Sequence, residues 1–300
     1  MTIQLEPSQI PNAGQYVVQT SRGDYVIQVA WPLCWTEDRV APEGDPPVST
    51  FYLVDGNAYF LTAVDVARRL EFTNGARAIV VGVGYPRTQY VYNWRRGPDL
   101  TPASPDGTYE MPVGRDGKPL AGVSFGEAER FLAFVEREVV AAVETRLFAH
   151  LARGTGRRAL FGHSYGGVFA LHALFTRPTL FDTFVAASPS LWWNRYFLAR
   201  AQEPALRQRA PPADPPPAVV LTWGASARRR PGEPDDAFAR RKEAAEDDRL
   251  EADAKALAQR LETYPSVRAV RTAQFEGEDH GSAAVAGLQR GIMTFLLEKE

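Results

Sequence analysis

The sequence is short of cysteine and histidine, and its charges nearly balance. A single cysteine, Cys34, among 300 residues excludes a disulfide within the chain. The four histidines are scattered and no Cys/His zinc spacing occurs, which argues against a metal centre. Lys and Arg number 34 against 36 Asp and Glu, a net charge of −2, so the composition gives no electrostatic reason to expect nucleic acid as a partner.

Long apolar runs are missing as well. No apolar stretch approaches the roughly 18 residues that a membrane-spanning helix needs, and residues 1–7 have neither a basic start nor the apolar core of a signal peptide. As written, the sequence predicts a cytoplasmic protein, although a chain from which a signal peptide had been removed, and which would be periplasmic, would read the same. Apolar residues at 45% and charged residues at 23% are ordinary for a globular protein with a hydrophobic core.

Segments typical of strands and helices alternate along the chain. An opening hairpin is expected over 16–31, and apolar runs predict buried strands over 49–54, 78–83, 158–161, 184–187, 218–223 and 267–275. Helices are expected over 61–70, 125–148, 167–174, 237–263 and 287–298. This alternation predicts an α/β protein with one mostly parallel sheet and helices on both faces. A stretch at about 85–123 is too long for a mere connection and is expected to be functional, and 209–217 reads as a proline-rich linker.

The pentapeptide at residues 162–166, Gly-His-Ser-Tyr-Gly, is the most informative motif. A predicted strand precedes it and a helix-compatible run comes after it, which is the context that a nucleophile elbow needs. In such an elbow a sharp turn lifts the serine hydroxyl above the sheet, and the flanking glycines leave room for the crowded backbone. The motif therefore predicts Ser164 as the nucleophile of a serine hydrolase, a chemistry that needs no metal and no organic cofactor.

A serine nucleophile needs a base, and His280 is the histidine best placed to be one. It comes after the last predicted strand, where α/β-hydrolases carry their base, and the chain order Ser164 then His280 fits that fold. The oxyanion that forms on attack needs two backbone N–H donors. We expect one from Tyr165, directly after the nucleophile, and the other from Asn57, in the Asp-Gly-Asn turn after the strand at 49–54.

The acid of a catalytic triad is not fixed by the sequence. It should come after the strand at 218–223, where the next carboxylates are Glu233, Asp235 and Asp236. These residues either complete a triad or belong to a solvated loop and a helix N-cap, and the second interpretation is slightly favoured. Asp279 adjoins the expected base, but its side chain should point away from the imidazole.

Three blocks together resemble a known family: Tyr-Leu-Val-Asp-Gly-Asn-Ala-Tyr-Phe at 52–60, Gly-His-Ser-Tyr-Gly-Gly at 162–167, and Ser-Pro-Ser-Leu-Trp-Trp-Asn at 188–194. They are similar to the putative-esterase branch of the α/β-hydrolases, which includes esterase D. Within it, the sequence looks most like the bacterial esterases of catecholate trilactone siderophores such as enterobactin and salmochelin. The resemblance implies a single α/β-hydrolase domain over 1–300 that cleaves siderophore esters for iron release, with a Ser–His dyad as in some members.

The expected substrate is therefore an aromatic, anionic siderophore. Arg87 and Arg96, in the loop after the strand at 78–83, would neutralise its charge, and Trp192 and Trp193 would stack on its rings. Two alternatives remain open. One is a general carboxylesterase for small acyl esters, in the manner of an S-formylglutathione hydrolase, and the other is a binding protein that kept the fold and lost catalysis. The sequence does not indicate the oligomeric state.

Overall fold

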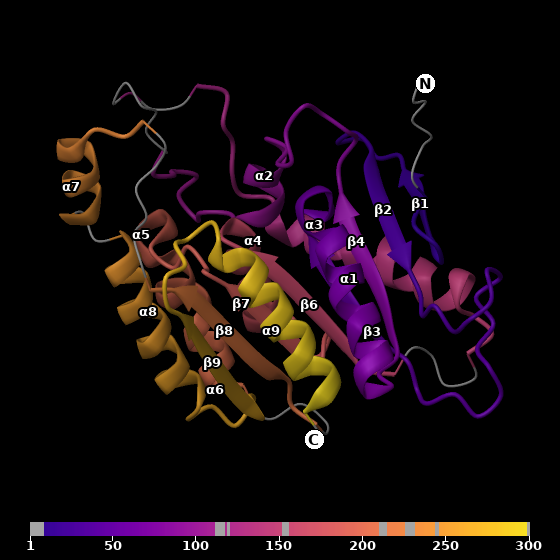
Figure 1. The fold of residues 1–300 in the computed structure, drawn as a ribbon. Coiled ribbons are helices and arrows are strands. Elements are labelled where there is room, and N and C mark those ends of the chain that lie inside the picture. Colours follow the sequence, from indigo (N-terminus) through magenta and orange to yellow (C-terminus); the bar gives the residue numbers. More distant parts are fainter. Residues whose placement is uncertain are drawn as a thin grey trace, which may run out of the picture.

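The computed structural model describes residues 9–111, 118, 121–151, 156–209, 215–225, 232–243 and 246–298. These residues include one eight-stranded sheet, in which neighbouring strands have the order β1-β2-β4-β3-β6-β7-β8-β9 (Figure 1). The strands are β1 (Ala13–Val18), β2 (Tyr25–Ala30), β3 (Ser49–Val54), β4 (Ala78–Gly84), β6 (Arg158–His163), β7 (Thr183–Ala187), β8 (Ala218–Gly224) and β9 (Ala269–Phe275).

The sheet is antiparallel at one edge and parallel across the rest. Strand β2 pairs antiparallel with both β1 and β4, which confirms the predicted hairpin. From β4 through β3, β6, β7, β8 to β9, every neighbouring pair is parallel. All residues of β4 and β7 are buried, because helices cover both faces, and this explains why these strands read as unbroken apolar runs. The predicted fold class is confirmed.

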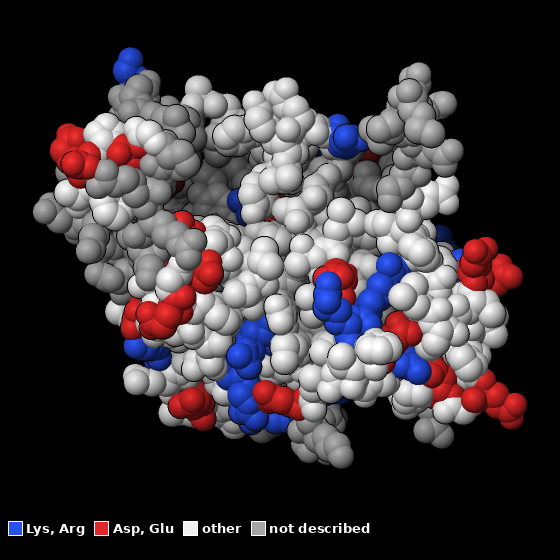
Figure 2. All heavy atoms as spheres, in the orientation of Figure 1, with Lys and Arg blue, Asp and Glu red and all other residues white. Residues whose placement is uncertain are grey.

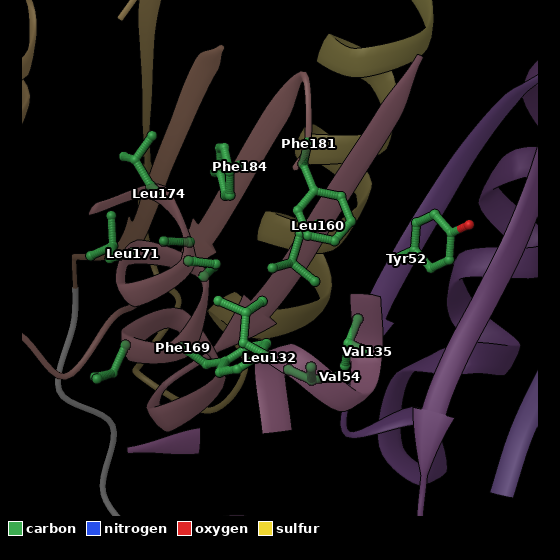
Figure 3. Packing of buried hydrophobic residues seen from close by; sticks show 14 of the residues in the cluster. Tyr52, Val54, Leu132, Val135, Leu160, Phe169, Leu171, Leu174, Phe181 and Phe184 are labelled. Atoms are coloured by element: carbon green, nitrogen blue, oxygen red, sulfur yellow. The ribbon is translucent and has the colours of Figure 1, made fainter. Parts of the chain in front are cut away.

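The helices form two layers, one on each face of the sheet (Figure 1), and each layer packs on the sheet through its own hydrophobic cluster. Helices α1 (Gly56–Asn74) and α9 (Ala283–Leu297) pack on one face, with Leu70 and Phe295 in their cluster. The opposite face is covered by α3 (Ala128–Phe134), α4 (Tyr165–Thr176) and α8 (Glu246–Leu261). Figure 3 shows part of this second layer, where Leu132 and Phe169 from the helices lie close to Leu160 of β6. None of the described helices is both long and apolar enough to cross a membrane.

Several predicted boundaries differ from the structure. The segment 237–263 was expected to be one helix, whereas the structure describes α7 (Asp235–Glu243) and α8, with residues 244–245 outside the described part. Leu250, Leu257 and Leu261 give α8 a buried apolar stripe, whereas residues 240–249 are mostly charged and do not mark the interruption. The last helix begins at Ala283 rather than at residue 287, since small alanines at its start pack into the core without marking an apolar period.

The remaining elements are short, and in Figure 1 α2 (Arg96–Leu100) lies near the upper end of the sheet whereas α6 (Glu203–Gln208) lies near its lower end. The predicted loop at 85–123 contains the helix α2, and the predicted helix at 125–148 continues beyond α3 as two π-helical segments. Residues 112–117 and 119–120 of that loop, and residues 210–214 of the proline-rich linker, lie outside the described residues. These elements are α2 (Arg96–Leu100), η1 (Val135–Val140), η2 (Val143–Leu147), α5 (Trp193–Phe197), η3 (Leu198–Gln202) and α6 (Glu203–Gln208).

Three neighbouring parallel strands end in the same unusual way. The residues that come directly after β3, β6 and β7 are Asp55, Ser164 and Ser188, with φ angles of 54°, 59° and 41°. Left-handed backbone is uncommon outside glycine and tends to mark functional sites, because the surrounding structure must stabilise it. The three strained turns lie close together, because paired parallel strands have their carboxyl ends on the same side of the sheet.

The turn after β6 leaves no room for a side chain at Gly162. A Cβ atom there would lie 2.0 Å from the carbonyl oxygen of Gly166, which is backbone and cannot move aside as a side chain could. We therefore expect Gly162→Ala to lower the free energy of unfolding by about 1–3 kcal/mol, as overpacking does. The matched control is Gly14→Ala on edge strand β1, where nothing lies within 4 Å of the added atom, and which should change stability by less than about 0.5 kcal/mol. Urea unfolding followed by circular dichroism measures both, and equal losses would contradict the steric account.

Candidate active site

Ser164 occupies a tight turn between β6 and α4. Its φ and ψ angles are 59° and −115°. The turn is held by its own backbone, because the Ser164 N–H donates to the carbonyl oxygen of Ala187 at 3.0 Å and the Val168 N–H donates to the carbonyl oxygen of Ser164 at 3.0 Å. The predicted strand–turn–helix arrangement around the serine is therefore present, and the side chain is half-buried at the edge of the sheet.

A second serine, which the sequence analysis did not assign, lies against the first. The Ser190 Oγ is 3.3 Å from the Ser164 Oγ, and Ser190 is 4% exposed. Its backbone N–H also points to the carbonyl oxygen of Ser164, at 3.4 Å. Ser190 belongs to the segment after β7, where Ser188 has its positive φ angle and donates its N–H to the carbonyl oxygen of Thr222 at 2.7 Å. The Ser-Pro-Ser sequence directly after a buried strand was the available signal.

His280 lies on the turn between β9 and α9, beside the elbow. Its carbonyl oxygen is 2.8 Å from the Nε2 of His163, the residue next to Ser164 in the chain. The two imidazole rings have centroids 4.9 Å apart. The carboxylate of Asp279 accepts hydrogen bonds from the backbone N–H groups of Gly281 and Ser282, at 3.0 and 2.8 Å, and so shapes the turn that carries the histidine.

Glycine at the end of β8 lets this turn come close to the sheet. A Cβ atom on Gly224 would lie 2.2 Å from the carbonyl oxygen of Glu278 and 2.8 Å from that of Asp279. Both contacts are with backbone, so a larger residue would have to displace the segment just before His280. The turn is thus held between β8 on one side and His163 on the other.

His163 is buried, neutral and bonded at both ring nitrogens. Its pKa is lowered to about 3, chiefly by burial. The charge of the neighbouring His280 ring also lowers the pKa, and this effect exceeds the opposite effect of the hydrogen bond to the His280 backbone. A carbonyl oxygen can only accept, so the Nε2 of His163 carries the proton and donates it to His280. The Nδ1 is then an acceptor, and the hydroxyl of Tyr59 donates to it at 2.9 Å.

Arg96 forms a buried ion pair with Asp55 next to the elbow, where its Nη2 also lies 3.5 Å from the carbonyl oxygen of His163. Its Nε and Nη2 donate to the two carboxylate oxygens at 3.0 and 2.9 Å. Burial alone would lower the pKa of Arg96, but the charge and hydrogen bonds of Asp55 outweigh it and raise the pKa above its usual value. The guanidinium also lies over the rings of Tyr92 and Tyr165, at 4.9 and 5.5 Å. Its charge is already neutralised, so these surroundings favour a structural role for Arg96 over the predicted contact with substrate.

The two predicted oxyanion donors both stand at helix N-termini. Asn57 is in the first turn of α1, and Tyr165 is the first residue of α4. First-turn N–H groups have no acceptor within their own helix, and the helix dipole favours negative charge there. Because β3 and β6 are adjacent, the two helices start from neighbouring strands. The Asn57 side chain accepts from the Tyr85 N–H at 2.7 Å and donates to its carbonyl at 2.8 Å, so it also holds the start of the 85–123 loop.

The other predicted substrate contacts differ in exposure. Trp192 is half-buried and its ring centroid lies 6.5 Å from that of His280. Trp193 is only 5% exposed and packs against Phe125 and Tyr109, with centroids 6.1 and 6.0 Å away, so its ring contributes to the core and offers little surface to a substrate. Arg87 is exposed on the loop between β4 and α2, which stands out at the upper edge of Figure 2 with a mostly uncharged surface.

The candidate acids lie near the start of α7. Asp235 and Asp236 are exposed in its first turn, where carboxylates favour the helix dipole, and Glu233 is half-buried just before them. Residues 226–231, between β8 and this helix, lie outside the described residues. A triad acid therefore stays a prediction. Over the described ranges, no group of three or more His, Cys, Asp or Glu is arranged to hold a metal ion.

The low pKa of His163 makes stability depend on pH. Its pKa falls from 6.5 in the unfolded chain to about 3 in the folded one, so the unfolded state binds more protons between these values and stability is lost as the pH falls through this window. Between about pH 7 and about pH 5, the wild type should lose about 2 kcal/mol more stability than His163→Gln, which does not titrate. Urea unfolding of both proteins at the two pH values measures the difference, and equal losses would show that His163 is not held neutral.

Comparison with known proteins supplies the family. The sequence model of the Putative esterase family matches residues 99–275, more than half of the chain. The siderophore enterobactin esterase of Emericella nidulans is 37% identical over 295 residues, which cover 96% of this chain and 95% of that protein. The siderophore triacetylfusarinine C esterase of Aspergillus fumigatus is 36% identical over 298 residues, covering 96% and 94%.

The fold agrees with these similarities. The solved structure of siderophore hydrolase EstA from Aspergillus nidulans matches with a TM-score of 0.88 at 36% identity, over 98% of this chain and 97% of that one. The resemblance seen in the sequence is thereby confirmed. The chain belongs to the Putative esterase family of α/β-hydrolases, whose members act on esters.

Proposed function

We propose that the protein is a serine esterase that hydrolyses the ester bonds of a siderophore through an acyl-enzyme, and so releases the iron that the siderophore carries. The observation that carries the proposal is the placement of Ser164 on its strained elbow beside the turn of His280, within a chain that is similar over nearly its whole length to two siderophore esterases.

In the first step of the proposed mechanism, the imidazole of His280 takes the proton of the Ser164 hydroxyl while the oxygen attacks the ester carbonyl carbon. The carbonyl electron pair moves onto its oxygen, where the N–H groups of Tyr165 and Asn57 stabilise the negative charge. The bond to the alcohol then breaks, and the imidazolium returns the proton to the leaving oxygen. Water repeats the sequence on the acyl-enzyme and restores the free serine.

The environment of the site supports an aromatic substrate. Trp192 presents a half-buried ring near His280, and the adjoining loop exposes Tyr90 and Trp94, at 64% and 74%. Exposed aromatic rings at a site offer stacking surfaces for catechol-like groups. Arg87 on the same loop is exposed and offers a positive charge to an anionic siderophore. Arg96 is less suited to this role, because its side chain is only 16% exposed and is paired with Asp55.

Replacing the nucleophile tests the chemistry. Ser164→Ala should lower kcat for p-nitrophenyl ester hydrolysis by a factor of about 10⁴ or more, because no hydroxyl remains to form the acyl-enzyme. The matched control is Ser21→Ala, an exposed serine on the β1–β2 turn, which should leave kcat unchanged. Full activity in Ser164→Ala would remove the proposed mechanism, and a wild-type protein without any esterase activity would favour a binding protein of the same fold.

A substrate comparison separates a siderophore esterase from a general carboxylesterase. We expect kcat/KM for enterobactin or triacetylfusarinine C, with and without iron, to exceed that for p-nitrophenyl acetate and S-formylglutathione.

Trp192→Ala should raise KM for an aromatic siderophore about tenfold, since one stacking contact is lost, and should leave KM for p-nitrophenyl acetate unchanged. Preferential turnover of the small esters, or an equal effect of Trp192→Ala on both classes, would support the carboxylesterase instead.

A further inference from the structure

A chain of three hydrogen bonds connects the 85–123 loop to the turn of His280. The hydroxyl of Tyr92, on the loop, is 2.5 Å from the hydroxyl of Tyr59, in the first turns of α1. The Tyr59 hydroxyl is 2.9 Å from the Nδ1 of His163, and the Nε2 of His163 is 2.8 Å from the carbonyl oxygen of His280. Four residues from four separate segments of the chain thus form one continuous path.

The direction of every hydrogen bond in the path is fixed. The His280 carbonyl accepts, so the single proton of the neutral His163 ring is on Nε2, and Nδ1 must accept from Tyr59. The single O–H of Tyr59 is used in that bond, so the Tyr59 oxygen accepts the hydrogen bond from Tyr92. Burial lowers the pKa of His163 to about 3 and raises the pKa of Tyr59, so both stay in the required protonation states near neutral pH.

The inner part of the path is buried and its outer end is accessible. Tyr59 and His163 are each 4% exposed, and the Tyr59 ring packs edge-on against Phe161 with centroids 5.6 Å apart. Tyr92 is 39% exposed. The guanidinium of Arg96, which is itself fixed by Asp55, lies 4.9 Å from the Tyr92 ring centroid, so the loop meets the path at a defined point.

We infer that His163 and Tyr59 are positioning residues that hold the His280 turn at the correct distance from Ser164, and that Tyr92 makes this positioning depend on the 85–123 loop. The inference rests on the proposed function, in which His280 is the base. A histidine before the nucleophile could simply be a satisfied core residue. Here, however, its one donated hydrogen bond goes to the backbone of the proposed base itself, so its loss would shift the base rather than only weaken the core.

Substitutions that mimic one ring nitrogen at a time test the role of His163. The amide nitrogen of glutamine reaches about as far as Nε2 and can still donate to His280, whereas that of asparagine reaches only the position of Nδ1. His163→Asn should lower kcat about 10–100-fold with KM within about twofold of wild type, because a shift of about 1 Å in the base costs that much in rate. His163→Gln should recover most of the activity, to within about fivefold of wild type. The readout is p-nitrophenyl ester kinetics on the full chain, with thermal unfolding as a check of the fold.

The tyrosines supply a second test that does not disturb the elbow. Tyr92→Phe removes one hydroxyl from the partly exposed end of the path and should lower kcat about threefold or more without raising KM. Tyr16→Phe, on edge strand β1, is the matched control, since its buried hydroxyl has no hydrogen-bond partner among the described residues and forms none of the bonds in the path. Its kcat should be that of wild type.

The outcomes distinguish this inference from the proposed function. Equal kcat in His163→Asn, His163→Gln and wild type, or equal losses in both variants, would overturn the positioning role, as would equal kcat in Tyr92→Phe and Tyr16→Phe. If His163→Asn does not fold, the comparison of the two tyrosine variants decides. Activity that survives Ser164→Ala would instead overturn the proposed function, whatever the His163 variants do.

Discussion

The left-handed turn at Ser164 is the constraint on which the rest of the site depends. A positive φ angle at a residue with a side chain costs energy, and the surrounding structure must supply it. Two hydrogen bonds stabilise the turn here. The parallel pairing of β6 with β7 places the Ala187 carbonyl to accept from the Ser164 N–H, and the Ser164 carbonyl accepts from the Val168 N–H in the first turn of α4. Gly162 provides the space that this turn needs.

Similar turns at the neighbouring strands put the other proposed parts beside the serine. Asp55 after β3 directly precedes α1 and binds Arg96 in an ion pair, while Ser188 after β7 leads to Ser190 and Trp192. The turn after β9 brings His280 to the same edge, because Gly224 lets its backbone approach β8. A parallel sheet thus gathers residues from distant parts of the sequence at one end of its strands.

Local patterns in the sequence predict the sheet and the elbow, whereas contacts between distant segments could not be predicted from them. Apolar runs and the Gly-x-Ser-x-Gly spacing were sufficient for the parallel sheet and for the elbow around Ser164. The ion pair of Arg96 with Asp55 and the burial of Trp193 depend on which segments meet in three dimensions, so the sequence alone could not reveal either of them. The role of His163 was hidden for the same reason, since its partners Tyr59 and His280 are far from it in the sequence.

The central claim is that the elbow and the His280 turn together make one serine reactive. Labelling with a fluorophosphonate, followed by mass spectrometry of the digested protein, tests this most directly, because Ser190 lies only 3.3 Å from Ser164 and acts as an internal comparison. The account predicts a single adduct on Ser164, formed rapidly in the wild type and much more slowly in His280→Ala. An adduct on Ser190, or labelling of Ser164 at an unchanged rate without His280, would contradict it.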